Sequence, residues 1–256
     1  MSSEDILTIP PPPADARVVY GKDPNQFGEL RFPKAGGPFP VVMNIHGGFW
    51  RAQYGLGHAG HLCAALTAKG YATWNVEYRR VGNPGGGWPG TFEDIASSYR
   101  FIPQIAKQYK LDASRILVMG HSAGGQLALC LAAHEGSVKS AVALAGVVDL
   151  QQAYQQHLSN DAVVEFLGGK PNEVPEHYHE ADPMELSIKV TQWLIQGAAD
   201  DVVPPSFSRN YVQAKQRSHE DAHYLEIGPA GHYDLIDPRS RAWASVLSTV
   251  MHLLPL

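Results

Sequence analysis

Residues 116–132 of the chain read ILVMGHSAGGQLALCLA. Residues 116–119 have the length and β-branched content of a buried strand, and residues 126–133 continue as an apolar, Ala- and Leu-rich helix. The GHSAG turn between them has the pattern of a nucleophile elbow, a tight strand-to-helix turn that lifts a serine hydroxyl above the sheet edge. Its two glycines are needed because a Cβ at either position would collide with neighbouring backbone. Ser122 is therefore the candidate nucleophile.

Strands and helices alternate through most of the chain, which predicts an α/β fold with a mostly parallel sheet of about eight strands and helices on both faces. A short antiparallel pair is expected ahead of the parallel strands. The predicted strands are residues 18–20, 27–32, 41–45, 72–76, 116–119, 138–144, 192–196 and 222–227, and the predicted helices are 56–69, 92–109, 126–133, 206–217 and 240–253.

We expect a single domain over residues 16–256, because no repeat or low-complexity linker divides the chain. Residues 1–15 are expected to be a disordered or loosely docked arm, since their proline run cannot join a helix or a central strand. Residues 150–187 are too long for a simple connection. They are predicted to form a small, helical, cap-like insert over the strand ends, with a plain surface excursion as the alternative.

The composition has a hydrophobic share of 44% and a formal net charge of −5, without a run of Lys or Arg. Nucleic acid and anionic membrane are therefore not expected as partners. The acidic start does not resemble a signal peptide, and no apolar stretch approaches the length of a membrane span. Cys63 and Cys130 fall on predicted helices, where buried free thiols behave as small hydrophobes. These features favour the cytoplasm.

A serine nucleophile needs a base that removes its proton and a group that orients the base. With this elbow the expected chain order is Ser, then Asp or Glu, then His, on loops after later strands. The turn after strand 192–196 carries Asp200 and Asp201, and the loop after strand 222–227 carries His232. His232 is the predicted general base and Asp200 its orienting acid. Asp201 is the alternative acid, because sequence cannot separate adjacent carboxylates on one turn.

The loop after strand 41–45 reads HGGFW over residues 46–50. The backbone N–H groups of Gly48 and Phe49, together with that of Ala123, are the predicted oxyanion-hole donors. Each such donor is typically worth on the order of a hundred- to a thousandfold in rate. His46 is expected to brace this loop through a hydrogen bond and not to act as a base.

Several side chains near the expected site are candidates for lining an acyl or aryl pocket, with core packing as the alternative for the tryptophans. They are Trp50, Trp88 and Phe92, with His157 and Leu158 from the insert.

The remaining histidines do not predict a metal site. His58 and His61 are three residues apart and His177 and His179 two apart, but neither pair has a third ligand nearby in the sequence. The glycine run at 85–87 lacks the spacing and the Gly-Lys-Ser/Thr ending of a phosphate-binding loop. We expect neither a metal nor a cofactor.

With these motifs the chain resembles the α/β-hydrolase superfamily of esterases and lipases over about residues 18–254. The HGGFW loop departs from the HGGG of hormone-sensitive-lipase-like esterases. It is similar to the loop of kynurenine formamidases (arylformamidases) and of small bacterial carboxylesterases, some of them feruloyl and acetyl esterases. Residues 77–79, 197–204 and 231–234 also resemble that branch. The resemblance implies Ser122, Asp200 and His232 as the triad, and Gly48, Phe49 and Ala123 as the oxyanion residues. Edge-strand dimers are common on this fold, so a homodimer is one alternative.

The predicted function is that of a serine hydrolase that cleaves carboxylic esters of small substrates through an acyl-enzyme. Hydrolysis of an N-formyl aryl amide by the same residues is the nearest alternative. A peptidase is disfavoured because the chain is too short for the propeller of prolyl oligopeptidases. A non-catalytic ligand-binding protein is disfavoured because the Ser, Asp and His candidates are all present.

Overall fold

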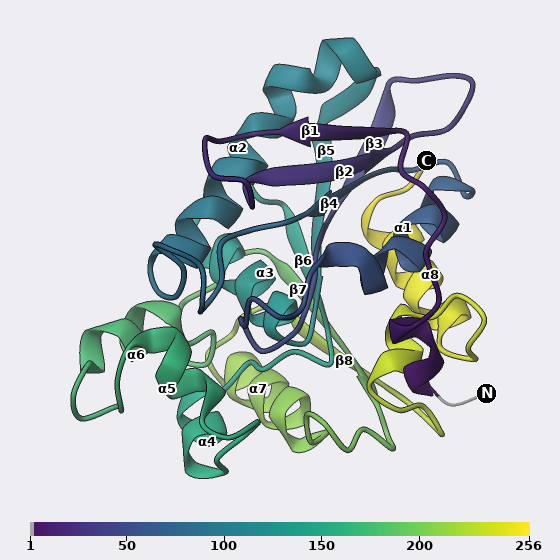
Figure 1. The fold of residues 1–256 in the computed structure, drawn as a ribbon. Helices are drawn as coiled ribbons and strands as arrows, with labels where there is room; N and C mark the ends of the chain where they lie inside the picture. Colours follow the sequence, from purple (N-terminus) through teal and green to yellow (C-terminus); the bar gives the residue numbers. More distant parts are fainter. Residues whose placement is uncertain (1–2) are drawn as a thin grey trace.

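In the computed structural model, which describes residues 3–256, eight strands form one sheet in the order β1-β2-β4-β3-β5-β6-β7-β8 (Figure 1). β1 and β2 pair antiparallel with each other and β2 with β4, while every pairing from β4 to β8 is parallel. The strands are β1 Ala16–Val19, β2 Phe27–Arg31, β3 Phe39–Ile45, β4 Ala72–Val76, β5 Leu111–His121, β6 Ser140–Leu144, β7 Thr191–Gly197 and β8 Ala222–Ile227. The predicted α/β fold class is confirmed.

The central strands are buried on both faces, since every residue of β3, β4 and β6 is buried. Such strands have continuous apolar runs without alternation, which is why the sequence revealed them. The strand β5 is longer than predicted and begins at Leu111. Its first residues pair with Phe39 and Pro40 ahead of a register shift at Pro40/Val41, and the polar stretch before Ile116 hid this extension.

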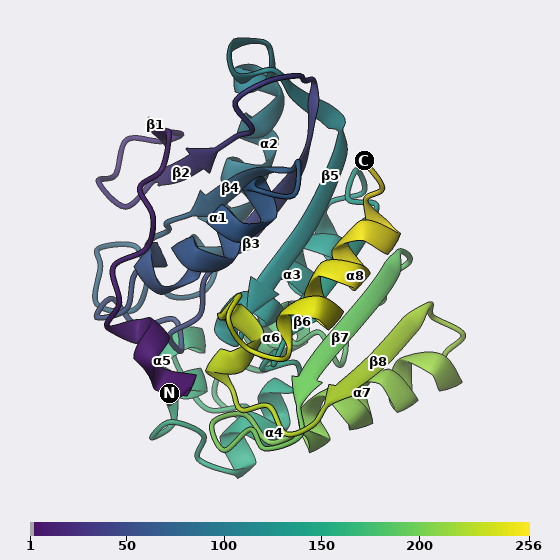
Figure 2. The same ribbon diagram turned by 90° about the vertical axis from the view of Figure 1, so that its right-hand side faces the viewer.

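Helices cover both faces of the sheet. α1 (Gly60–Thr67) and α8 (Trp243–Leu253) lie on one side of the sheet in Figure 1, and α2 (Gly90–Tyr109) and α3 (Ala123–His134) lie on the other. Figure 2 shows α8 running in front of the strands. Buried side chains of α7 (Ser206–Arg217) join the core on the side of α2 and α3.

Residues 150–187 contain three short helices, α4 (Leu150–Gln155), α5 (Ala162–Leu167) and α6 (Pro175–Ala181). Phe166 and Tyr178 are each 1% exposed and pack with the main core. The segment is therefore helical and partly buried. Within residues 3–256, no helix is both long and apolar enough to cross a membrane.

The N-terminal segment packs closely against the core, whereas a disordered or loosely docked arm was expected. Residues Ser3–Leu7 form the 3-10 helix η1, and Ile6 is fully buried in the core beside α1 and α8. The proline run follows the surface, where Arg31 Nη2 donates a hydrogen bond to Pro12 O at 2.9 Å. Prolines cannot join a helix, but their carbonyl groups still accept hydrogen bonds, so the segment can be held along its length. Residues 1–2 of the predicted arm lie outside the described part.

Candidate active site

Ser122 stands between β5 and α3 with backbone angles φ 57° and ψ −121°. This left-handed conformation is rare for a residue with a Cβ and is typical of strained functional turns. A Cβ on Gly120 would lie 2.0 Å from Gly124 O, and one on Gly124 would lie 2.1 Å from Ile45 O. Both glycines of the GHSAG turn are therefore required by close backbone contacts, for the reason that the sequence suggested.

His232 and Asp200 lie at the carboxyl ends of the neighbouring parallel strands β8 and β7. His232 Nδ1 donates a hydrogen bond to Asp200 Oδ2 at 2.8 Å, and both side chains are buried. Since Nδ1 carries the proton of this bond, a neutral ring has its free lone pair on Nε2. His232 and Ser122 line the same cavity. The structure therefore brings together the predicted nucleophile, base and acid.

The Asp200 carboxylate is held by its own turn. Its Oδ1 accepts hydrogen bonds from the backbone N–H groups of Val202 and Val203 at 2.9 and 2.8 Å, and Oδ2 accepts one from Gln196 Nε2 at 2.9 Å. Asp201 is exposed. The structure thus places Asp200 beside His232, and it leaves the alternative acid facing solvent.

The loop after β3 lies directly against the elbow, because a Cβ on Gly47 would come within 2.9 Å of Ser122 Cβ. Gly48, Phe49 and Trp50 all have positive φ, at 113°, 50° and 57°. Among residues 3–256, no acceptor is hydrogen-bonded to the backbone N–H of Gly48, Phe49 or Ala123. Within the described residues, the three predicted oxyanion donors therefore have no protein partner, and Gly48 and Phe49 line the same cavity as Ser122.

His46, the first residue of this loop, is held by hydrogen bonds at both ring nitrogens. Its Nδ1 donates to Gly47 O at 2.7 Å and its Nε2 donates to Glu77 Oε1 at 3.0 Å. The Gly47 carbonyl and the Glu77 carboxylate thus hold the ring from both of its nitrogens. Its ring stacks on Tyr78 at 4.4 Å. A ring bonded at both nitrogens has no free lone pair, as the bracing role of His46 requires.

Glu77 is nearly fully buried and bonded on both oxygens. Oε2 accepts from Leu56 N at 3.1 Å, and Oε1 pairs with Arg80 Nη1 at 2.8 Å. Burial acts to raise the pKa of Glu77, but His46 and then Arg80 outweigh it, so the pKa lies below its ordinary value. The Glu77 carboxylate therefore carries a negative charge beside the HGGFW loop that follows β3.

His121, the residue before Ser122, links the GHSAG turn to the loop of His232. Its Nε2–H donates to the backbone carbonyl of His232 at 3.1 Å, and the two ring centroids are 4.4 Å apart. Burial, and then the nearby rings of His232 and His58, hold the pKa of His121 well below its ordinary value. No role was predicted for this neutral histidine, although its place inside the GHSAG motif was a usable signal.

The cavity at Ser122 has a volume of about 90 Å³. The predicted residues Gly48, Phe49, Ser122 and His232 line part of it. Sequence reasoning missed the rest of the lining, which comes from loops and from the N-terminal segment: Leu7, Tyr54, His58, His121, Ser159 and Tyr233. His121 and Tyr233 are sequence neighbours of Ser122 and His232, whereas only the fold brings Leu7, Tyr54, His58 and Ser159 to the cavity.

Trp50 does not line the cavity, contrary to the expectation. It is 1% exposed, its Nε1 donates to Gln126 Oε1 at 3.0 Å, and its ring stacks on Phe166 at 4.5 Å. The left-handed backbone at Trp50 turns the side chain into the core between the loop and the insert. The core-packing alternative therefore holds for this tryptophan.

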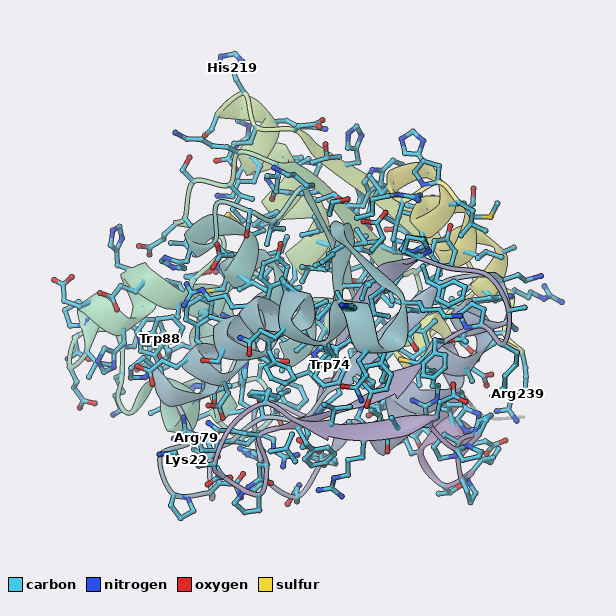
Figure 3. All side chains as sticks on the ribbon, turned by 90° about the horizontal axis from the view of Figure 1, so that it is seen from above. Lys22, Trp74, Arg79, Trp88, His219 and Arg239 are labelled. Carbon is cyan, nitrogen blue, oxygen red and sulfur yellow. The ribbon has the colours of Figure 1, made fainter. Side chains whose placement is uncertain are left out.

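The other four predicted pocket residues are also not among those that line the cavity. Trp88 and Phe92 stack on each other at 5.4 Å, and Figure 3 shows Trp88 beside the helices of the insert. His157 is exposed and its Nδ1 donates to Asp161 at 2.8 Å, while Leu158 packs against the core. Proximity to a motif in sequence did not identify the lining, because side-chain direction is set by packing.

The paired histidines make separate hydrogen bonds. His61 Nε2 donates to Ile9 O at 3.0 Å, His177 Nδ1 donates to Leu167 O at 2.7 Å, and His179 Nδ1 bonds Glu185 at 3.0 Å. In the part of the chain that the structure describes, no group of three or more His, Cys, Asp or Glu residues is arranged to hold a metal ion.

Comparison with known protein families matches residues 30–214 to the BD-FAE family. Among curated proteins, the chain is 27% identical over 280 residues to esterase LipC of Mycobacterium tuberculosis, covering 91% of this chain and 64% of LipC. The chain thus spans less than two thirds of the length of this relative.

Two solved structures have the same fold. A truncated carbohydrate esterase from gut microbiota superposes with a TM-score of 0.81 at 20% identity, covering 94% of this chain and 98% of that one. Esterase B from Lactobacillus rhamnosis superposes with a TM-score of 0.81 at 19% identity, covering 98% of this chain and 89% of that one. At such identities the similarity supports the α/β-hydrolase fold but does not identify a substrate for this chain.

Proposed function

The chain belongs to the BD-FAE family, and from that premise we propose that it is a serine carboxylesterase acting on small esters through an acyl-enzyme. The observation that carries the proposal is the buried 2.8 Å hydrogen bond between His232 and Asp200, at the cavity that Ser122 also lines. A serine, a base and an orienting carboxylate at one cavity suit acyl transfer.

In acylation, His232 Nε2 takes the proton of Ser122 as Oγ attacks the ester carbonyl carbon. Asp200 keeps the proton on Nδ1 and stabilises the imidazolium that forms. The N–H groups of Gly48, Phe49 and Ala123 donate hydrogen bonds to the carbonyl oxygen and stabilise the negative charge that develops on it. The imidazolium then protonates the leaving alcohol, and the acyl group remains on Ser122.

In deacylation, a water molecule replaces the alcohol. His232 removes a proton from this water, and the hydroxide attacks the acyl carbonyl while the same donors hold the oxyanion. Collapse of the intermediate returns the proton to Ser122 and releases the acid. His121, through its bond to the His232 carbonyl, keeps the base loop against the elbow in both half-reactions.

The cavity size favours a short acyl group. A water molecule occupies about 30 Å³ in the liquid and a 150 Å³ cavity holds benzene, whereas this cavity measures about 90 Å³. Acetyl or propionyl groups therefore fit better than an aromatic acid. The HGGFW resemblance and this size also support formamide hydrolysis as a second candidate, since formyl is the smallest acyl group.

The test is kcat/KM for p-nitrophenyl acetate, butyrate and octanoate, methyl ferulate and N-formylkynurenine. We expect acetate to be the best ester, and Ser122→Ala to lower kcat by on the order of 10⁶ in a folded protein. A hundredfold preference for N-formylkynurenine, about 2.7 kcal/mol of transition-state stabilisation, would instead make the protein a formamidase.

Labelling with a fluorophosphonate gives an independent control. We expect the label on Ser122, lost in Ser122→Ala and kept in Ser159→Ala, which removes the other cavity serine. Turnover by a clean preparation of Ser122→Ala would overturn the proposal. A folded wild-type protein that neither reacts with the label nor cleaves any of the substrates would point to a ligand-binding role.

We place this activity in a reducing compartment such as the cytoplasm. Cys63 and Cys130 are buried, unpaired thiols, and burial raises the pKa of each thiol. Such thiols persist where disulfides are kept reduced. A homodimer through the exposed edge of the sheet stays a prediction from the resemblance.

A further inference from the structure

The N-terminal 3-10 helix η1 contacts the two short helices that follow the catalytic loops. It packs against η2 (Leu56–Ala59), which follows the oxyanion loop, and against η3 (Tyr233–Ile236), which begins directly after His232. Leu7, the last residue of η1, lines the cavity with Ser122 and His232. A segment more than a hundred residues from the nucleophile in sequence is thus part of its surroundings.

Neighbouring residues of η1 have different surroundings. Ile6 is fully buried in the core cluster that contains Leu235 and Ile236 of η3. The turn closes through hydrogen bonds from the N–H groups of Thr8 and Ile9 to Asp5 O, both at 3.2 Å. Past Leu7, Ile9 O accepts a hydrogen bond from His61 Nε2 of α1 at 3.0 Å, so the segment is anchored on both sides of Leu7.

Leu7 remains 42% exposed even though it is anchored in this way. An apolar side chain at the rim of a cavity gains about 25 cal/mol for each Å² that a ligand removes from water. A hydrocarbon chain that extends from the ester carbonyl past the 90 Å³ cavity would meet this leucine. Contact with Leu7 thus stabilises an acyl group that fits inside the cavity, whereas the volume of the leucine blocks the path of a longer chain.

We propose that η1 is a wall of the acyl site and that Leu7 sets the upper length of the acyl group. The inference rests on the proposed esterase function and deepens it. Catalysis by Ser122, Asp200 and His232 does not depend on it, whereas the ranking of acyl chains does.

The test compares Leu7→Ala with Leu7→Phe by kcat/KM for p-nitrophenyl acetate, butyrate and octanoate. Shortening Leu7 opens the wall, so we expect Leu7→Ala to raise the octanoate-to-acetate ratio at least tenfold. The larger side chain of Leu7→Phe should lower the butyrate-to-acetate ratio of kcat/KM below the wild-type value. Val19→Ala is the control, because Val19 is also an exposed apolar residue at 60% but lies on β1, and its ratios should stay within twofold.

A second readout does not need turnover. Rates of covalent labelling of Ser122 by ethyl and octyl fluorophosphonates should shift in the same direction in Leu7→Ala. The assignment of Leu7 would be overturned if neither the kcat/KM ratios nor the labelling-rate ratios changed. This holds for variants whose unfolding temperature equals that of the wild type. If the wild type cleaves none of the esters, the esterase proposal fails, and the labelling series still decides the role of η1.

Discussion

At the scale of single residues, burial distinguishes two neighbouring aspartates that have the same chemistry in the sequence. Asp200 accepts hydrogen bonds from His232, Gln196 and two backbone N–H groups, whereas Asp201 faces water. A carboxylate held in this way orients the imidazole and stabilises its charged form in the transition state. The same side chain one position later would do neither.

We expect Asp200→Asn to lower kcat by about 10⁴, because an amide facing Nδ1 favours the wrong tautomer of His232. Asp201→Asn makes the same chemical change at the exposed position and should leave kcat within twofold. The measurement is kcat for p-nitrophenyl acetate, with circular dichroism to show that both variants are folded. Equal losses in the two variants would contradict the assignment.

At the scale of elements, Arg51 links the loop after β3 to the insert. Its guanidinium donates to both carboxylate oxygens of Glu165 on α5, at 2.8 and 3.1 Å, and to Ser159 Oγ and O at 3.1 and 2.9 Å. Ser159 lines the cavity and belongs to a run in which residues 157 and 159–161 all have positive φ. Such backbone conformations each cost about 1–3 kcal/mol and persist only where the surrounding structure holds them.

Arg51→Lys should loosen this run, because an ammonium keeps the charge but cannot reproduce the planar fork. We expect KM for p-nitrophenyl acetate to rise several-fold with a smaller change in kcat. Hydrogen exchange at residues 157–161 should become faster. Glu165→Gln leaves the hydrogen bonds from Arg51 to Ser159 in place, so we expect it to change KM and hydrogen exchange less than Arg51→Lys does. Unchanged exchange in Arg51→Lys would show that the insert holds this run without Arg51.

At the scale of the whole molecule, histidines around the active site link stability to pH. Burial, and then the nearby charge of His46, lower the pKa of His58 to about 4 from an ordinary 6.5. The pKa of His121 is lowered as well. An unfolded chain binds protons at these rings at higher pH than the folded protein does, so acid favours unfolding.

For His58 this stabilisation is fully present above pH 6.5 and is lost as pH falls toward 4. The expected loss is roughly 3 kcal/mol in the free energy of unfolding, at about 1.4 kcal/mol per pKa unit. The measurement is urea unfolding at pH 7.5, 6 and 4.5 for wild type and His58→Gln. The variant should lose less stability on acidification, and parallel curves would exclude His58 as the cause.

The sequence by itself determined the features that depend on neighbouring residues. The α/β class followed from the alternation of short strand patterns with helical stretches, and β4 and β8 begin and end at the predicted residues. The GHSAG turn identified Ser122, and strand-end loops identified His232 as the base candidate, which the structure places at the cavity of Ser122. These signals are local, because turn geometry and strand burial constrain residues that are adjacent in the chain.

Only the tertiary structure decided which side chains meet. It set Asp200 and not Asp201 against His232, turned Trp50 into the core, and brought Leu7 to the cavity. The start of β5 at Leu111 also depended on pairing with β3. Each of these outcomes is a contact between segments distant in sequence, and its direction is set by close packing, which no local pattern encodes.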